Sequence, residues 1–235
     1  MRVGIIGTGA ISHKHAQAYR NIGYRVVACA ASDPSRARTF ADQYGCEPVD
    51  RWQDLCLRSD IDYADVCTFP NFRLEAVELC AQAKKHVQVQ KPVATSLDTA
   101  RRMVETARSA GILLNVVSQH RFDESAQFLK RAIGAGRLGR ILQADAYVKW
   151  FRPDAYYARS VKGSWAVEGG GALTIRRGAC HRIGIRGQRR PAVRIRSNRS
   201  NSGSHRIQPG HPERLEFHGT RGTAIITGDV LTRWT

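Results

Sequence analysis

Apolar and polar positions in the first half of the chain follow two alternating patterns. Short apolar runs predict β-strands at residues 2–6, 24–30, 63–67, 86–90 and 112–117. Stretches with helical spacing separate them, most clearly at residues 34–44 and 97–110, where Asp33 and Ser96 are expected to cap the helices. This alternation predicts an α/β fold with a doubly wound parallel sheet that helices cover on both faces.

The pattern changes after about residue 120. A helix is expected at residues 124–133 and a hairpin at residues 214–227. Residues 141–150 alternate, which predicts a half-buried strand whose inner positions are Leu142, Ala144, Ala146, Val148 and Trp150. We therefore expect two domains, 1–120 and 121–235, the second an incomplete α+β domain with an open mixed or antiparallel sheet.

The charge is concentrated in one segment. The chain has a net charge of +17, and residues 176–206 supply ten arginines with no lysine and no acidic residue. Two hypotheses explain this: a segment translated in a shifted frame of a GC-rich gene, or an insertion that binds nucleic acid or another anionic surface. The first is favoured, because the segment has no aromatic residue for base stacking and no regular period. We expect it to provide no strand partner for residues 141–150.

The remaining composition is that of an ordinary globular protein. The chain contains no run of about 18 apolar residues, so no membrane-spanning helix is predicted. The N-terminus lacks the features of a signal peptide, and the six cysteines form no CxxC pair. A cytoplasmic protein with reduced thiols and no membrane partner is expected.

A glycine-rich turn follows the first predicted strand and precedes a predicted helix. This is the context in which G-x-G-x-x-G motifs bind a dinucleotide. Gly7 permits a tight turn, Gly9 lets the backbone approach a pyrophosphate, and Ser12 stands in place of the third glycine. The expected cofactor-binding residues of this turn are Gly7, Thr8, Gly9, Ala10, Ile11 and Ser12. The alternative is a glycine turn in an α/β protein that binds no nucleotide.

The end of the second strand bears on the choice of cofactor. An acidic residue usually binds the ribose 2′-hydroxyl of NAD there, but this chain has Ala31 and Ser32, and Asp33 is expected to cap the next helix. Arg36 lies one turn further on. Ser32 and Arg36 therefore join the predicted cofactor site and favour NADP slightly over NAD, although Arg36 also fits a solvated helix residue.

A lysine directly follows the predicted strand at residues 86–90. Lys91 lies between Gln90 and Pro92, at the carboxyl end of a predicted parallel strand, where ligands bind. Its amine could donate a hydrogen bond to a substrate oxygen, and the alternative is an ordinary surface lysine. His13 and His15 have the spacing of a metal-binding pair, but no third ligand lies nearby in the sequence, so we expect no metal.

An ordered set of segments resembles the Gfo/Idh/MocA oxidoreductases, the glucose–fructose oxidoreductase and inositol dehydrogenase family. The resemblance covers most of residues 1–175 and 207–235. Its segments are 3–12, 68–71, 85–94, 119–122, 136–141, 165–173 and 218–222. The family implies a Rossmann NAD(P)-binding domain, an α/β substrate and oligomerisation domain, and hydride transfer between a nicotinamide and a sugar or polyol carbon.

The resemblance also assigns residues to the site. Lys91 matches the lysine of the family's Glu-Lys-Pro motif, with Gln90 in place of the glutamate. A two-residue slip aligns His181 with the expected histidine, which makes Lys91 and His181 the predicted catalytic residues. The remaining implied contacts lie beside the cofactor or face the cleft; they are Thr68, Pro70, Asn71, Gln90, Gln119 and Arg121.

The resulting expectation is an NAD(P)-dependent oxidoreductase that acts on a small sugar-like alcohol or ketone. Homo-oligomers through the C-terminal sheet are expected from the family. Turnover is expected to be impaired, because the Arg-rich segment disturbs the family pattern and the chain stops short of the family's last elements. The alternatives are an NAD(P)-binding protein without catalysis and an Arg-rich nucleic-acid-binding protein.

Overall fold

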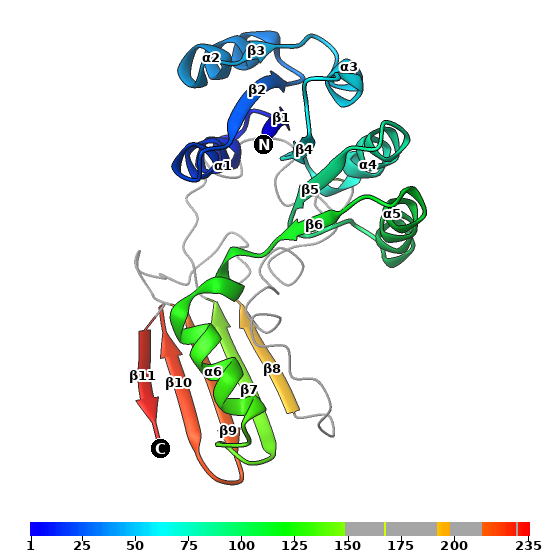
Figure 1. Cartoon of the computed structure of the whole chain (residues 1–235). Helices are drawn as coiled ribbons and strands as arrows, with labels where there is room; N and C mark the ends of the chain where they lie inside the picture. Colours follow the sequence, from blue (N-terminus) through cyan, green and yellow to red (C-terminus); the bar gives the residue numbers. More distant parts are fainter. Residues whose placement is uncertain (149–166, 168–191, 198–212, 229) are drawn as a thin grey trace, which may run out of the picture. The chain divides into compact units, whose positions relative to one another are not determined.

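The described residues divide into two compact units. A computed structural model describes residues 1–148, 167, 192–197, 213–228 and 230–235. The first unit contains Met1–Val117 and also Val167, and the second contains the other described residues from Ser118 on. The first unit contains a parallel sheet, and the second contains a mixed sheet with one long helix (Figure 1).

The first unit is built from alternating strands and helices. Its strands are β1 (Arg2–Ile6), β2 (Arg25–Ala30), β3 (Glu47–Pro48), β4 (Tyr63–Val66), β5 (His86–Gln90) and β6 (Leu114–Val117). Its helices are α1 (Ala10–Asn21), α2 (Pro34–Tyr44), α3 (Trp52–Leu57), η1 (Pro70–Phe72), α4 (Arg73–Gln82) and α5 (Leu97–Ala110). The strands pair in parallel in the order β3-β2-β1-β4-β5-β6, which confirms the predicted doubly wound sheet.

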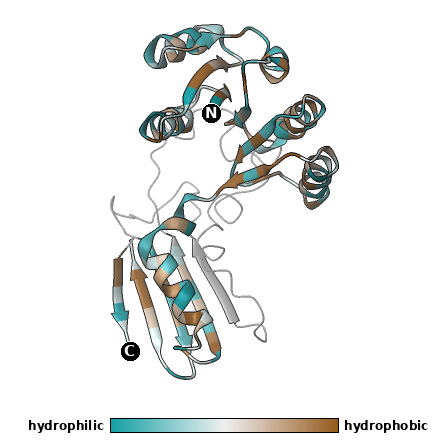
Figure 2. Ribbon diagram, in the orientation of Figure 1, coloured by the Kyte–Doolittle hydropathy of each residue, from teal (hydrophilic) through white to brown (hydrophobic). Residues whose placement is uncertain are grey.

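Alternating side chains of the strands form a core on each face of this sheet. Val3 and Ile5 of β1 belong to a cluster with α1 and α2, whereas Ile6 belongs to the cluster with α3, α4 and α5. Successive side chains of a strand point to opposite faces, so one short strand supplies both cores. Figure 2 shows hydrophobic segments on these strands and mixed hydropathy around the helices that cover them.

The predicted helix caps are present. The Asp33 carboxylate accepts a hydrogen bond from the Ser35 main-chain N–H at 2.9 Å, and Ser96 Oγ accepts one from the Thr99 N–H at 3.1 Å. Helix α2 ends at Gly45, whose φ angle of 68° is left-handed. These contacts satisfy backbone groups that a helix leaves unpaired at its ends.

The second unit packs a helix on one face of a sheet. Its elements are η2 (Gln119–Phe122), α6 (Glu124–Gly134), β7 (Ile141–Val148), β8 (Ala192–Ser197), β9 (Arg214–Gly219), β10 (Thr223–Thr227) and β11 (Val230–Trp234). The strand order is β11-β10-β9-β7-β8, antiparallel except for the β7–β8 pair. Leu129 of α6 is fully buried against Leu215 and Phe217 of β9, among other apolar residues of the sheet.

One predicted inner position of β7 is wrong. Leu142 is 48% exposed, whereas Ile141, Ala144 and Ala146 are buried. The pairing of β7 with β9 is irregular between Ile141 and Gln143, and such an irregularity shifts the alternation by one residue. The predicted inner position Trp150 lies outside the described residues.

The expectation that the Arg-rich segment provides no strand is also wrong. Residues 192–197 form β8, which pairs in parallel with β7. Val193 and Ile195 alternate with arginines in the sequence, and the register places them beside Ala144 and Ala146 of β7. An alternation of two over four residues, 193–196, lies within this six-residue edge strand, although it is hidden in a segment of otherwise scattered apolar residues.

A lysine follows helix α4 where a glycine is usually found. Lys84 has a φ angle of 56°, and among the described residues it is the one non-glycine residue with positive φ. Its N–H donates to the Ala81 carbonyl, which closes the helix end. Left-handed backbone costs a residue with a Cβ about 1 kcal/mol or more.

We predict that Lys84→Gly stabilises the first unit by about 0.5–1 kcal/mol, because glycine adopts this conformation without a steric penalty. Urea denaturation measures the change in the free energy of unfolding. Gly111→Ala is the matched reverse exchange: Gly111 follows α5 with a φ angle of 70°, and an added Cβ there meets no atom within 4 Å. It should destabilise by a similar amount, and a destabilised Lys84→Gly variant would contradict the prediction.

Candidate functional site

The carboxyl ends of β1, β4 and β5 lie at one edge of the parallel sheet. These strands are neighbours, and strand order reverses direction between β1 and β4. Ligands of doubly wound sheets bind at this kind of switch point. The chain leaves the three strands here through Gly7, Cys67 and Lys91.

Gly7 allows two of these loops to approach closely. Its φ angle is +96°, and a Cβ atom would lie 3.2 Å from the Cys67 carbonyl carbon and from the Thr68 nitrogen. Gly9 is different, because a Cβ atom there would meet no described atom within 4 Å. The turn is therefore closed against the protein at Gly7 and open at Gly9.

Helix α1 begins directly after this turn with its N-terminus uncapped by a side chain. Gly9 is the cap residue and the first turn has no acidic residue. Ser12 is fully buried, and its hydroxyl donates to the Gly9 carbonyl at 2.5 Å, so it supports the turn from inside. Free N–H groups at a helix N-terminus attract anions.

The residues of the turn fit the pyrophosphate of a dinucleotide. Gly9 leaves open space beside the turn, into which a larger side chain would project. The hydroxyls of Thr8 and Thr68 are buried without a hydrogen-bond partner among the described residues. Unpaired buried hydroxyls are uncommon in folded proteins, so these two hydroxyls retain unused hydrogen-bonding capacity in the loops next to the turn.

Arg36 lies next to the same turn. The residue is exposed, and its guanidinium Nη2 donates a part-buried hydrogen bond to the Thr8 carbonyl at 3.3 Å. The Asp33 carboxylate accepts from both the N–H and the hydroxyl of Ser35, and these hydrogen bonds hold the pKa of Asp33 below its usual value. Ser32 is exposed between the strand end and this cap.

The other predicted residues of this edge follow β4 and β5. Pro70 is buried in η1, and Asn71 beside it is exposed. Lys91 is exposed, and its main-chain N–H donates to Gln90 Oε1 at 3.0 Å. The Gln90 side chain is buried, so it accepts this hydrogen bond inside the protein rather than facing solvent.

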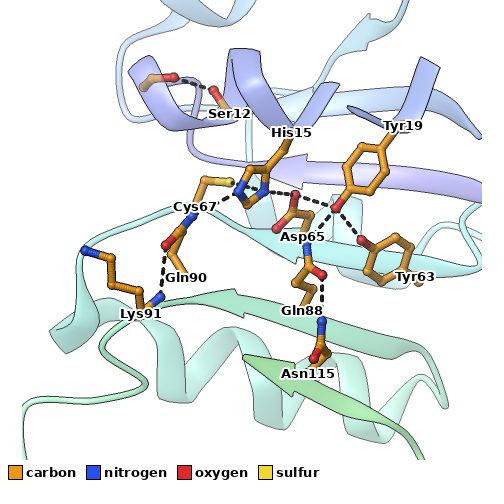
Figure 3. A network of polar contacts seen from close by, with 11 residues as sticks. Ser12, His15, Tyr19, Tyr63, Asp65, Cys67, Gln88, Gln90, Lys91 and Asn115 are labelled. Carbon is orange, nitrogen blue, oxygen red and sulfur yellow. Dashed lines mark hydrogen bonds and ion pairs between the residues drawn. The ribbon is translucent and has the colours of Figure 1, made fainter. Parts of the chain in front are cut away.

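A buried polar network connects Gln90 to helix α1 (Figure 3). Gln90 Nε2 lies 2.9 Å from His15 Nε2, and His15 Nδ1 lies 2.7 Å from Asp65 Oδ2. Since Gln90 Oε1 accepts from the Lys91 N–H, its Nε2 is the donor to His15. His15 Nε2 is then the acceptor of this hydrogen bond, and His15 Nδ1 donates to Asp65.

The network continues from Asp65 toward the edge of the sheet. Tyr19 donates to Asp65 Oδ2 at 2.7 Å and contacts the Tyr63 hydroxyl, and Gln88 donates to Tyr19 at 2.8 Å. Gln88 in turn accepts from Asn115 of β6. Burial and the Asp65 charge raise the pKa of Tyr19 far above its usual value, so the phenol remains a donor. The network thus connects α1 with β4, β5 and β6.

Three residues of this region could offer ligand atoms to a metal ion, but His15 among them already has two polar partners. His15, Asp65 and Cys67 offer ligand atoms within 4.8 Å of one another. Both ring nitrogens of His15 are engaged by Gln90 and Asp65, and burial raises the pKa of the Cys67 thiol, which favours its neutral form. His13 hydrogen-bonds Tyr44 instead, so the two histidines of the HxH pair have separate partners.

The sequence analysis missed the network because its members are single polar residues far apart in the chain. His15 and Asp65 are 50 positions apart. The available signal was Asp65 itself, an acidic residue inside a short apolar strand.

Three other predicted site residues lie in the second unit or outside the described residues. Gln119 is exposed and Arg121 half-buried, both in η2 of the second unit. His181 lies outside the described residues.

Every described helix is too short or too polar to cross a membrane.

Comparison with known proteins identifies relatives over the same region. Residues 1–118 match the family model of the Gfo/Idh/MocA oxidoreductases, described as an oxidoreductase family with an NAD-binding Rossmann fold. Myo-inositol 2-dehydrogenase of Thermotoga maritima is 33% identical over 60% of this chain and 42% of its own length. D-glucoside 3-dehydrogenase of Escherichia coli is 36% identical over 62% of this chain and 42% of its own.

Solved structures share the fold of this chain. The WlbA dehydrogenase of Bordetella pertussis, solved with NADH and UDP-GlcNAcA, superposes with a TM-score of 0.86 at 25% identity, covering 100% of this chain and 77% of that one. Levoglucosan dehydrogenase superposes with a TM-score of 0.80 at 20% identity, over 97% and 73%. The chain spans about half the length of the curated relatives it matches. The family match over half of the chain, together with the uncapped glycine turn of a doubly wound sheet, shows that the chain belongs to the Gfo/Idh/MocA oxidoreductase family.

Proposed function

We propose that this chain binds a nicotinamide dinucleotide at the carboxyl edge of its parallel sheet and takes part in hydride transfer to or from a sugar or polyol. The observation that carries this proposal is the uncapped N-terminus of α1 behind the open Gly9 position. The named activities of the curated relatives, on inositol and on a glucoside, support a polyhydroxy substrate.

The residues of the edge take different roles in this proposal. Main-chain N–H groups at Gly9, Ala10 and Ile11 bind the pyrophosphate, while Gly7 and Ser12 shape the turn. Thr8 and Thr68 provide unpaired hydroxyls beside it. Pro70, Asn71 and Gln119 are proposed contacts that rest on the family resemblance.

Lys91 is proposed to act on the reacting oxygen. When bound, the nicotinamide supplies the hydride donor or acceptor. The exposed Lys91 amine donates a hydrogen bond to the substrate oxygen and stabilises the negative charge that develops on it. Gln90 holds the Lys91 main chain in place. His181 is proposed as the proton-transfer residue from the resemblance alone.

The cofactor preference is proposed to be NADP. Arg36 reaches the glycine turn through the Thr8 carbonyl, so its guanidinium is available for a 2′-phosphate. The Asp33 carboxylate is engaged in capping α2. A cytoplasmic location and self-association through the β7–β11 sheet are further proposals that follow the family pattern.

Gly9→Val tests the binding site. A valine side chain would occupy the open space beside Gly9 where the pyrophosphate is proposed to bind, so we expect the affinity for NADPH to fall by about tenfold or more, which corresponds to about 1.4 kcal/mol. The fold should survive, because an added Cβ meets no described atom. Titration of NADPH fluorescence measures the affinity.

Gly134→Val is the matched control, since Gly134 is equally open but lies at the end of α6. Equal NADPH affinity in the Gly9→Val variant and the wild type would place the phosphates elsewhere.

Arg36→Ala tests the cofactor preference. The wild type should bind NADPH at least as tightly as NADH. The variant should lose about tenfold in NADPH affinity with little change for NADH, because only NADPH carries the 2′-phosphate. Arg38→Ala, an exposed arginine of the same helix, is the control. A strong preference of the wild type for NADH would contradict the proposal and indicate Asp33 as the ribose ligand.

Lys91→Ala tests the chemistry. In a panel of polyols and sugars with NAD and NADP, the variant should lose about 100-fold or more of any turnover that the wild type shows, while cofactor affinity changes little. Lys130→Ala, an exposed lysine of α6, should behave as wild type. Unchanged turnover in the Lys91→Ala variant would remove this lysine from the mechanism.

A further inference from the structure

Arg73 is buried at the start of helix α4 and makes an unusual set of contacts. The residue is 3% exposed. Nε and Nη2 donate to the Thr68 carbonyl at 3.0 and 2.6 Å, and Nη1 donates to the carbonyls of Gln90 and Pro92. One guanidinium therefore binds the main chain after β4 and the main chain after β5.

These contacts enclose the proposed catalytic lysine. Gln90 and Pro92 are the residues on either side of Lys91, and Arg73 holds the carbonyls of both. The Lys91 N–H donates to the Gln90 side chain, which His15 holds in turn (Figure 3). The main chain of Lys91 is thereby fixed on both sides while its side chain is exposed.

The third carbonyl connects this segment to the glycine turn. Thr68 follows β4, and its main-chain nitrogen is within 3.2 Å of the Cβ position that Gly7 lacks. Displacement of the Thr68 loop would therefore reach the turn at which the dinucleotide is proposed to bind.

Burial of the Arg73 guanidinium has a desolvation cost. No carboxylate within the described residues forms an ion pair with it, and the carbonyls are its acceptors. Burial lowers the pKa of Arg73 to about 10, although the nearby Asp65 carboxylate raises it, so the group is still charged at neutral pH. An apolar side chain in its place would leave the carbonyls of Thr68, Gln90 and Pro92 without this donor, so the contacts of Arg73 hold the two loops beside the site.

We propose that Arg73 is a positioning residue that fixes Lys91 relative to the Thr68 loop and the glycine turn. This inference rests on the proposed function of Lys91. Arginine suits the task because its planar guanidinium carries five N–H donors in a rigid fork. Lysine keeps the charge but cannot reach three carbonyls from one fixed plane.

Hydrogen–deuterium exchange of Arg73→Lys and Arg73→Gln is the first test, with Arg102→Lys as the control on an exposed arginine of α5. Faster exchange should be confined to peptides that cover residues 67–72 and 90–94. A purely structural role would speed exchange throughout the sheet. Unchanged exchange in both segments, or a general increase in both variants, would overturn the proposal.

The second test follows acetylation of Lys91 by mass spectrometry, with Lys14, Lys84 and Lys130 as internal references. In the wild type, NADPH should slow acetylation of Lys91. In Arg73→Lys this protection should fall by about tenfold, because a small displacement is enough to lose contact geometry. Arg73→Ala should also lose the protection of Lys91 by NADPH, and a low concentration of guanidinium should restore that protection. Full protection of Lys91 in Arg73→Lys would contradict the proposal. If NADPH fails to bind the wild type, the proposed function fails, and exchange still decides the role of Arg73.

Discussion

The close approach of two backbone turns at Gly7 is the constraint on which the site depends. Because Gly7 has no Cβ, the chain leaving β1 comes within van der Waals distance of the chain leaving β4. The main-chain hydrogen bond from Cys67 to Ile6 forms beside it, at 2.8 Å. Helix α1 starts from this turn, so the direction of its free N–H groups is set by the same contact.

Placing α1 in this position buries polar groups that the protein must satisfy internally. His15 faces Asp65 of β4, and Gln90 of β5 completes the pair. Arg73 donates hydrogen bonds to a carbonyl of the loop after β4 and to a carbonyl at the end of β5. Buried polar groups are expensive when unpaired, so each contact restricts where its neighbours can lie. Together these contacts hold the main chain on either side of Lys91, whose side chain is exposed.

Much of the first unit was predictable because it depends on local signals. The apolar runs identified the strands, and Asp33 and Ser96 were recognised as helix caps from their positions. The glycine turn was predictable because its chemistry is contiguous. Arg73 was not, since an arginine at the start of a helix is ordinarily a solvated residue and only the tertiary fold shows its three carbonyl partners. Strand β8 was missed for a related reason: its short period of two lies within an arginine-rich segment.

The central claim is that the dinucleotide lies at the open end of the glycine turn beside Lys91. A crystal structure of the chain with NADPH tests it most directly. The account predicts pyrophosphate oxygens within hydrogen-bond distance, about 3 Å, of the main-chain nitrogens at the start of α1. It also predicts the nicotinamide ring on the side of Lys91. Pyrophosphate density away from Gly9, with the α1 N-terminus occupied by solvent, would contradict the account.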